Sequence, residues 1–232
     1  IDKKIKTDKL KIIDVDLKFN NPFNVSLKSA KLFIKKSLNL GHREALKKGV
    51  AGIINCPINK ELLQKENQGV TEYLSSKCNI KDGSEVMLIK SKNMSVSPIT
   101  THLDLKNVSK KINSKLIIKK IVTINNWFKK IYKKTPKVAI LGLNPHNAEL
   151  KKNSEEVKRI IPAVKKLKKI GIKITGPLVA DTIFINDYKK YDVIVGMYHD
   201  QILPSFKSIF KYDAINITLG IKYLRLSPDH GV

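Results

Sequence analysis

Three of the five histidines follow predicted strands, and a neutral imidazole is a good ligand for a divalent metal ion. They occur in the segments TTHL (100–103), LGLNPH (141–146) and MYHD (197–200). The carboxyl ends of parallel strands meet at one edge of an open α/β sheet, where ligands bind. His102, His146 and His199 are therefore candidates for a shared metal site, although their wide separation in the chain equally allows three unconnected structural or surface histidines.

The elements that must position these residues are those of an α/β protein. Predicted helices cover 108–133 and 154–170; the second begins at Ser154 as N-cap and ends before Gly171. Short apolar runs predict strands at 51–56, 86–89, 138–143, 172–175, 192–197 and 214–219, with a further extended segment at 94–99. Strands alternating with amphipathic stretches favour βα units and a largely parallel sheet.

The formal net charge of +25 comes almost entirely from lysine, because Arg43, Arg159 and Arg225 are the only arginines. Nucleic-acid readers use arginine and aromatic residues, but aromatic residues make up only 6% of this chain, so we expect no nucleic-acid partner. The sequence contains neither a long apolar span nor a secretory signal pattern, and Cys56 and Cys78 form no metal motif. We expect a cytoplasmic protein with reduced thiols and no membrane partner.

Six segments, in order and in spacing, resemble the 4-hydroxythreonine-4-phosphate dehydrogenase family over nearly the whole chain. They are INCPINK (54–60), TTHLDL (100–105), LGLNPHNAE (141–149), GPLVADTIF (176–184), MYHDQILPSFK (197–207) and INITLGIKYLRLSPDHG (215–231). The resemblance implies an α/β, two-domain fold like that of isocitrate and isopropylmalate dehydrogenases, with largely parallel sheets and a cleft between the domains. It also implies a homodimer with its site at the subunit interface.

Within that fold, residues 1–66 would be the remainder of the first α/β domain. Residues 67–232 would form the metal- and substrate-binding region, truncated at its C-terminal end. The glycine-rich segment that opens family members and the segment that follows DHG have no counterpart here. On this basis we expect the 232-residue chain alone to be a poor dehydrogenase, and an inactive remnant is one alternative.

The resemblance also implies roles for individual residues. Its metal ligands fall on His102, His146 and His199, and its substrate contacts fall on Thr71, Lys207, Asn216 and Arg225. The candidate catalytic residues are Asp181, Asp200 and Lys207. For both aspartates a helix cap or the orientation of a neighbouring histidine is an equal alternative to proton transfer. Lys207 and Arg225 have the alternative of being solvated surface charges.

Two positions depart from the family pattern near the substrate. The family's GHTE motif corresponds to Gly69-Val70-Thr71-Glu72, so Val70 replaces a substrate-binding histidine and offers no hydrogen bond. His42, in GHRE, precedes INCPINK instead of following it, and we interpret it as a surface residue.

The implied reaction is the oxidation of 4-phosphooxy-L-threonine, followed by decarboxylation to 3-amino-2-oxopropyl phosphate in vitamin B6 biosynthesis. The implied cofactors are NAD, or NADP, and a divalent metal (Zn, Mg or Co). A divalent ion stabilises charge that develops on a hydroxyl oxygen and then polarises the ketone for loss of carbon dioxide. Because of Val70, an alternative is a dehydrogenase for another phosphorylated four-carbon acid, such as phosphothreonate or phosphoerythronate.

Overall fold

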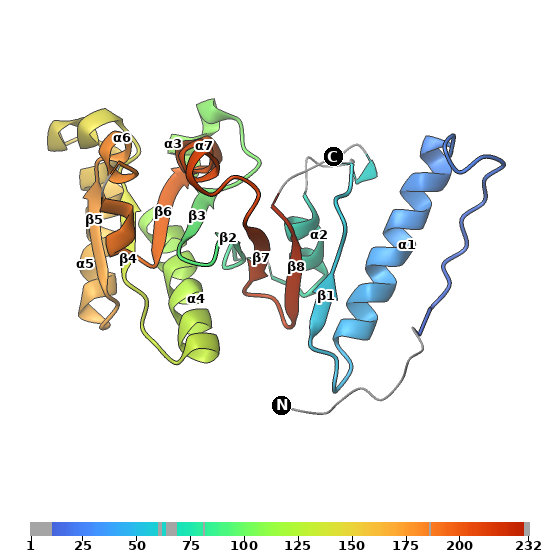
Figure 1. Cartoon of the computed structure of the whole chain (residues 1–232). Helices are drawn as coiled ribbons and strands as arrows, with labels where there is room; N and C mark the ends of the chain where they lie inside the picture. The colour runs from blue at the N-terminus through green and yellow to red at the C-terminus, as the bar shows by residue number, and fades with distance from the viewer. Residues whose placement is uncertain (1–10, 60–61, 64–68, 81, 186, 230–232) are drawn as a thin grey trace.

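The computed structural model describes residues 11–59, 62–63, 69–80, 82–185 and 187–229. These residues form one mixed eight-stranded sheet with the strand order β1-β8-β7-β2-β3-β6-β4-β5 (Figure 1). The strands are β1 Gly52–Ile54, β2 Val86–Lys90, β3 Ser95–Thr100, β4 Val138–Leu141, β5 Ile174–Leu178, β6 Val193–Tyr198, β7 Ile215–Leu219 and β8 Leu224–Pro228. The α/β class is confirmed, whereas the two-domain arrangement and the boundary after residue 66 stay predictions.

Helices cover the sheet and extend beyond its β1 edge. The α-helices are α1 Leu27–Ala45, α2 Val70–Lys77, α3 Leu105–Lys111, α4 Ser114–Tyr132, α5 Ile161–Lys169, α6 Ala180–Ile183 and α7 His199–Phe210. The shorter elements are the 3-10 helices η2 Pro145–Leu150 and η4 Asp187–Lys190 and the π turn η3 Glu156–Ile160. No helix of the described chain is long and apolar enough to cross a membrane.

The parallel half of the sheet is the part that positions the histidines. Strands β3, β6, β4 and β5 pair in parallel, so their carboxyl ends lie at the same edge. Strands β2, β7 and β8 pair antiparallel with their neighbours, while β1 is parallel to β8. At this last pairing a Cβ on Gly52 would lie 2.0 Å from the carbonyl oxygen of Leu224, so only glycine allows the two strands to approach.

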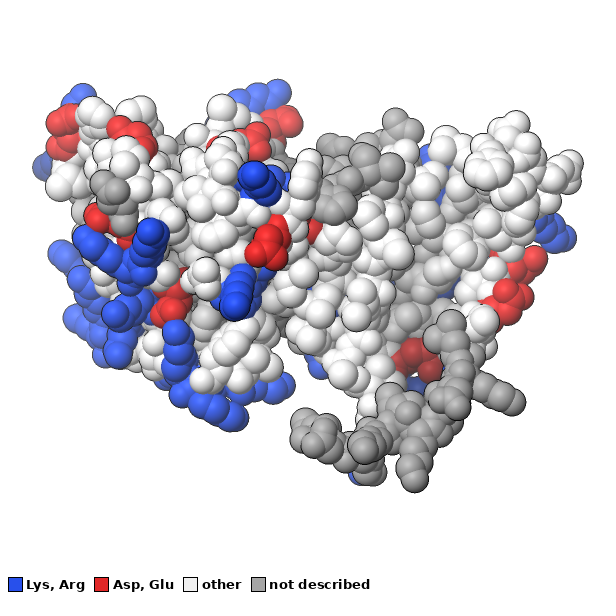
Figure 2. All heavy atoms as spheres, in the orientation of Figure 1, with Lys and Arg blue, Asp and Glu red and all other residues white. Residues whose placement is uncertain are grey.

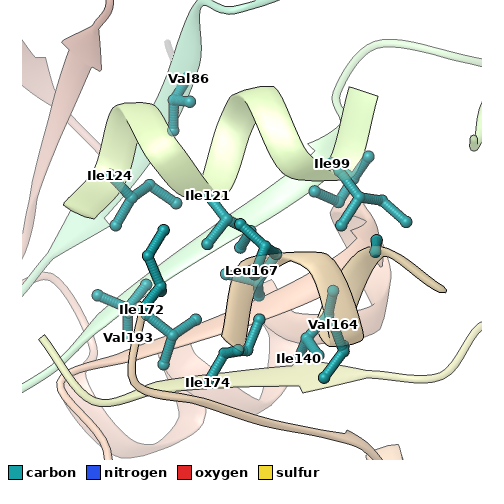
Figure 3. Packing of buried hydrophobic residues seen from close by; sticks show 14 of the residues in the cluster. Val86, Ile99, Ile121, Ile124, Ile140, Val164, Leu167, Ile172, Ile174 and Val193 are labelled. Carbon is teal, nitrogen blue, oxygen red and sulfur yellow. The ribbon is translucent and has the colours of Figure 1, made fainter. Parts of the chain in front are cut away.

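Two hydrophobic cores lie on the two faces of the sheet because neighbouring residues of a strand point to opposite sides. On one face, α4 and α5 pack on the strands, with Ile121, Ile124 and Leu167 among the fully buried residues (Figure 3). On the other face, α7 contributes Ile202 and Phe206 to a second core. The carboxyl ends of the parallel strands are therefore held by a three-layer sandwich.

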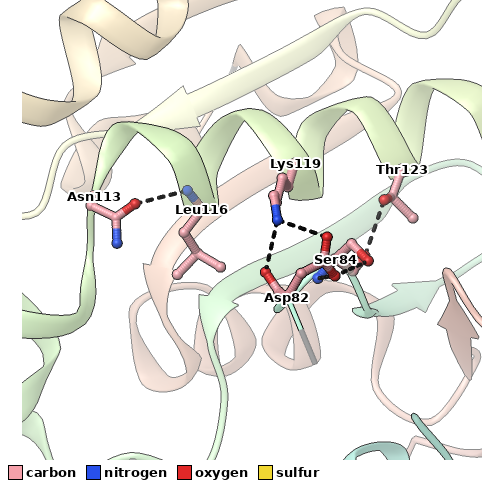
Figure 4. A network of polar contacts seen from close by, with 6 residues as sticks. All are labelled: Asp82, Ser84, Asn113, Leu116, Lys119 and Thr123. Carbon is pink, nitrogen blue, oxygen red and sulfur yellow. Dashed lines mark hydrogen bonds and ion pairs between the residues drawn. The ribbon is translucent and has the colours of Figure 1, made fainter. Parts of the chain in front are cut away.

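The predicted helix 108–133 is wrong as a single helix, because α3 and α4 are separate. Ile112 and Asn113 adopt extended backbone conformations, and Asn113 caps α4 by accepting a hydrogen bond of 2.9 Å from the Leu116 amide. The hydrophobic periodicity of the sequence continues across this break and therefore does not indicate that the helix is interrupted. Helix α4 then docks on the segment before β2 through a Lys119–Asp82 ion pair of 2.7 Å (Figure 4).

The predicted helix 154–170 is confirmed with one addition. Ser154 Oγ accepts a hydrogen bond from the Val157 amide at 3.3 Å, and Gly171 follows the helix with a φ of +81°. The first turn is a π turn, which the sequence did not indicate. Helix α1 and strand β8 were not predicted either.

The positive charge is largely a property of the outer helical surfaces. Lysine and arginine side chains gather over the end of the molecule that holds α4 and α5 (Figure 2). On α5, for example, Lys165, Lys166, Lys168 and Lys169 are exposed while Val164 and Leu167 face the core. This separation is what an amphipathic helix produces, with its polar residues opposite its apolar stripe.

Candidate functional site

Two of the three predicted metal ligands meet at the carboxyl ends of β3 and β6. The ring centroids of His102 and His199 lie 6.1 Å apart. Because β6 pairs in parallel with β3, the chain segments that follow both strands emerge side by side. His199 is the first residue of α7, directly after β6.

The orientation of His199 is set by its neighbour. The Nδ1 atom of His199 lies 2.6 Å from Oδ1 of Asp200, and a carboxylate accepts, so Nδ1 carries the proton. In the neutral ring with this tautomer, Nε2 carries the lone pair with which imidazole binds a metal. Of the two roles proposed for Asp200, this contact favours the orientation of a histidine.

The two histidines belong to a cavity of about 260 Å³ that also contains every predicted substrate contact. Its lining includes six residues chosen from the sequence, namely Thr71, His102, His199, Lys207, Asn216 and Arg225. It also includes Asn55, Ser227 and Asp229, which sequence reasoning missed. Residues from α2, α7, β7 and β8 thus converge with the two histidines, although they lie as far as about 150 residues apart in the chain.

Arg225 is the most buried cation of this cavity, with only 3% of its surface exposed. Its Nε atom donates to Oδ1 of Asn55 at 2.8 Å, and Nη1 donates to Oγ1 of Thr218 at 3.3 Å. Burial lowers the pKa of Arg225 to about 10, while the nearby Glu72 carboxylate acts in the opposite direction. The guanidinium is still cationic at neutral pH. The surface-charge alternative for Arg225 is therefore wrong.

Three oxygen atoms at the cavity have no hydrogen-bond partner among the described residues. They are Oδ1 of Asn216 and both carboxylate oxygens of Asp229, all of them buried. Lys207 reaches the same corner, where its ammonium donates to the backbone oxygen of Asp229 at 3.2 Å. Buried polar atoms without partners are costly, so this corner is suited to a ligand that carries hydrogen-bond donors.

The start of α2 forms one wall of the cavity. A Cβ on Gly69 would lie 2.8 Å from Oε2 of Glu72 and 3.0 Å from Nε2 of His102, so any larger residue there would displace these two side chains. Val70 follows as the first residue of α2 and lines the cavity. Its aliphatic side chain contributes no hydrogen bond, as the sequence indicated.

The third predicted ligand, His146, lies apart from the other two. Its ring is 68% exposed, with Nε2 at 3.6 Å from Oδ2 of Asp181 and Nδ1 at 3.7 Å from Oε1 of Glu149. Within the described part of a single chain, no three His, Cys, Asp or Glu side chains are grouped closely enough to hold a metal ion. Asp181 thus accompanies His146 and does not line the cavity, and a site shared by three histidines stays a prediction.

His42 is not the free surface residue that its place in the sequence suggested. Its Nδ1 atom is 2.9 Å from the hydroxyl of Tyr223, and the two rings meet edge to face. Burial lowers the pKa of His42, and repulsion from Lys77 and Lys222 lowers it further by a smaller amount. Cys56 and Cys78 are unpaired, as expected.

Sequence comparisons place this arrangement among known proteins. The model of the family described as pyridoxal phosphate biosynthetic protein PdxA matches residues 2–232. The chain is 37% identical over 227 residues to the 4-hydroxythreonine-4-phosphate dehydrogenase of Sulfurihydrogenibium sp., covering 96% of this chain and 68% of that protein. It is 40% identical over 192 residues to the enzyme of the same name from Aquifex aeolicus, covering 81% of this chain and 59% of the relative.

Two further similarities bear on fold and substrate. The crystal structure of 4-hydroxythreonine-4-phosphate dehydrogenase from Klebsiella pneumoniae aligns with a TM-score of 0.74 at 29% identity, covering 90% of this chain and 64% of that one. An Oceanobacillus iheyensis protein, whose name points to D-threonate 4-phosphate dehydrogenase, is 33% identical over 228 residues, covering 96% of this chain and 67% of the relative. The chain thus spans about two thirds or less of the length of these relatives.

Proposed function

This chain belongs to the family of pyridoxal phosphate biosynthetic protein PdxA, and from that premise we propose that it acts on 4-phosphooxy-L-threonine. The proposed reaction oxidises the C3 hydroxyl with NAD, and loss of carbon dioxide then gives 3-amino-2-oxopropyl phosphate. The observation that carries this proposal is the single cavity in which two imidazoles, two cations and unpartnered oxygens meet.

The polar groups of the cavity complement the proposed substrate. Its phosphate and carboxylate are anions, for which Arg225 and Lys207 supply charge-assisted hydrogen bonds. Its ammonium and hydroxyl groups are donors, for which the oxygens of Asn216 and Asp229, unpaired among the described residues, are acceptors. Binding would then neutralise a buried cation and satisfy buried oxygens in one step, which favours a phosphorylated hydroxy amino acid over an apolar ligand.

The two histidines of the cavity also supply part of the ligand set that a divalent metal ion needs. Two rings bound to one tetrahedral ion at about 2.1 Å place their centroids roughly 5 Å apart, and those of His102 and His199, at 6.1 Å, would move slightly closer on binding it. We propose that His146 of a second copy supplies the third ligand, because in its own chain it lies exposed and outside the cavity. A bound divalent ion would act as a Lewis acid on the substrate hydroxyl and on the later ketone.

The cavity is too small for the nicotinamide cofactor that the family implies. Pockets for drug-sized ligands occupy about 300–1,000 Å³, and this one measures about 260 Å³. We therefore assign the cavity to the substrate and to two of the metal ligands, and we derive no step from contacts to NAD. Within the cavity, the role of Lys207 and Arg225 is to hold the substrate anions in a fixed orientation.

Turnover of 4-phosphooxy-L-threonine tests the proposal. In a version extended to the length of its relatives, NAD, Co²⁺ and this substrate should give NADH, measured by its absorbance, whereas the 232-residue chain alone should give little. Lys207→Met should lower kcat/KM by about 100-fold or more, because one charge-assisted contact to the substrate is lost. Lys211→Met, on the exposed residue that ends α7, is the matched control and should leave kcat/KM unchanged. Equal rates for the two variants would remove Lys207 from the site.

Val70 favours a second candidate, which is oxidation of D-threonate 4-phosphate. That acid lacks the ammonium group and carries a hydroxyl in its place, so it needs fewer hydrogen-bond acceptors in the cavity than 4-phosphooxy-L-threonine does. The similarity to the Oceanobacillus iheyensis protein points in the same direction. The kcat/KM values for the two substrates, measured side by side, decide between them; a higher value for D-threonate 4-phosphate would replace the first proposal with the second.

A further inference from the structure

The loop that carries His146 has an unusual backbone. Five consecutive non-glycine residues, from His146 to Leu150, have φ values between +48° and +57°. The left-handed region brings Cβ too close to the carbonyl oxygen in every L-residue, so isolated residues visit it but runs of them are rare. Such a run persists only where the surrounding structure over-determines it, and these places are often functional.

Glu156 is the first anchor of this loop. Its side chain is fully buried on the π turn, and Oε1 accepts hydrogen bonds from the amides of Leu143 and Asn144, both at 2.8 Å. The other oxygen, Oε2, accepts from the side-chain amide of Asn144 at 3.1 Å. The carboxylate thus clamps the two residues that immediately precede Pro145 and His146. Single π turns are themselves frequent at functional sites.

The far side of the loop has two more anchors. Asn147 is buried and donates from Nδ2 to the Pro177 oxygen at 3.2 Å. Gln201 donates from Nε2 to the Gly142 oxygen at 2.6 Å and accepts from the Met197 amide at 2.6 Å. Gln201 lies on α7, the helix that begins with His199 and contains Lys207. The loop is therefore tied to the helix that contributes two residues to the cavity.

This buried scaffold supports side chains that point to solvent. His146 and Glu149 are both 68% exposed, so the anchors do not serve to bury the loop. Burying a carboxylate costs free energy, so its use to hold an exposed turn indicates that the position of the turn matters. Groups that hydrogen-bond a metal ligand commonly fix its orientation, and here the carboxylate holds the backbone that leads to His146.

We propose that Glu156 is a positioning residue, which clamps the backbone at Leu143 and Asn144 so that His146 is presented for insertion into the cavity of a second copy. The inference rests on the proposed function, because it takes His146 to be a metal ligand. The buried carboxylate of Glu156, which touches neither metal nor substrate, thereby sets the affinity of the site for the ion.

The test is a titration of the purified protein with Co²⁺, followed by the visible absorption of the bound ion. His146→Ala tests the proposed function itself and should weaken Co²⁺ binding by about 100-fold or more. Glu156→Gln should weaken it by about 10- to 100-fold, the range found for groups behind a ligand. The matched control is Ile160→Val on the same π turn, which shortens a fully buried side chain and should leave Co²⁺ affinity unchanged.

A second readout follows the clamp directly. Hydrogen exchange at the amides of Leu143 and Asn144 should be slow in the wild type and in Ile160→Val, and faster in Glu156→Gln. Glutamine places an NH₂ group against the donating amide of Asn144, so Asn144→Asp in the same chain should restore part of both the protection and the Co²⁺ affinity.

The outcomes separate the two ideas. If His146→Ala leaves Co²⁺ binding unchanged, the proposed metal role of His146 fails, and the inference fails with it. If His146→Ala weakens binding but Glu156→Gln weakens it no more than Ile160→Val does, the proposed function stands and the positioning role is overturned. A loss in Glu156→Gln, with partial recovery in the double variant, supports the clamp.

Discussion

Burial and charge oppose each other at Arg225. A guanidinium with 3% exposure, held by the side chains of Asn55 and Thr218, has lost most of its contact with water, and no carboxylate of the described residues hydrogen-bonds to it directly. Burying a charge is costly unless it is paired and hydrogen-bonded. An anionic group of a ligand would provide that pairing.

Arg225→Lys should raise KM by about 10- to 100-fold and change the melting temperature by only a few degrees. Lysine keeps the charge but replaces a planar fork with a single ammonium, so bidentate contact to the substrate anion is lost. Steady-state kinetics with 4-phosphooxy-L-threonine and a thermal melt measure the two effects. Arg43→Lys, at an exposed position, is the control; unchanged kinetics in both variants would show that Arg225 does not touch the substrate.

Val70→His should raise kcat/KM for 4-phosphooxy-L-threonine by about 10-fold if that compound is the substrate. Histidine would add a hydrogen-bond donor at the cavity wall, where valine now has none. One hydrogen bond to a charged group contributes about 1.5–3 kcal/mol. Val70→Leu controls for the change in volume. A fall in kcat/KM with histidine, greater than that with leucine, would indicate that the cavity is shaped for a different acid.

At the scale of the elements, the caps and loops determine how strands present their ends. The segment before α4 shows this, because Asn113 ends one apolar run and starts the next helix. Asn113→Ala should lower the free energy of unfolding by about 1 kcal/mol, since the amide of Leu116 loses its acceptor. Urea unfolding followed by circular dichroism measures this loss. Asn93→Ala, in the turn between β2 and β3, is an exposed control expected to have a smaller effect.

Asp192 joins the starts of two neighbouring strands. Its carboxylate accepts from the Lys134 ammonium at 2.7 Å and from the Lys137 amide at 2.8 Å, which ties the entry of β6 to that of β4. Burial alone would raise the pKa of Asp192, but these hydrogen bonds outweigh it and lower the pKa. A lowered folded-state pKa means that the stabilisation is complete above the unfolded-state value and is lost as the pH falls through the folded-state value.

Asp192→Asn should therefore destabilise the protein by about 1–2 kcal/mol at neutral pH. The difference from the wild type should shrink as the pH falls from about 4 towards the lowered folded-state value, and it should vanish only when the folded carboxyl is protonated as well. Urea titrations at several pH values measure this. Asp187→Asn, which removes an exposed ion pair with Lys190, should change stability by less than about 0.5 kcal/mol throughout. A difference for Asp192→Asn that does not vary with pH would argue against the charged interaction.

At the scale of the whole molecule, the exposed His146 and the two-histidine cavity are complementary halves of one predicted site. Complementation between variants tests whether two copies share it. His146→Ala and His102→Ala should each abolish tight Co²⁺ binding. After the two variants are unfolded together and refolded as a mixture, half of the dimers are mixed and each contains one intact site. Tight binding should then recover to roughly a quarter of the wild-type stoichiometry. No recovery would place all ligands within one chain.

The sequence by itself determined the α/β class, most of the strands and six of the residues that line the cavity. Apolar runs such as 138–143 and 192–197 predict strands because buried parallel strands need continuous apolar residues. The family motifs then identified Thr71, Lys207, Asn216 and Arg225, all of which line the cavity in the structure. These are properties of local composition and of short segments, which do not depend on how the chain returns on itself.

Only the tertiary structure decided which of these residues meet. Strand order places β6 beside β3, so His199 and His102 approach each other. His146 lies apart from them on a turn with left-handed backbone conformations, which no sequence pattern predicted. Asp229 and Glu156 acquire their importance from burial against distant backbone and side-chain groups. Proximity between residues far apart in the chain is a result of sheet order and packing, and a linear pattern contains neither.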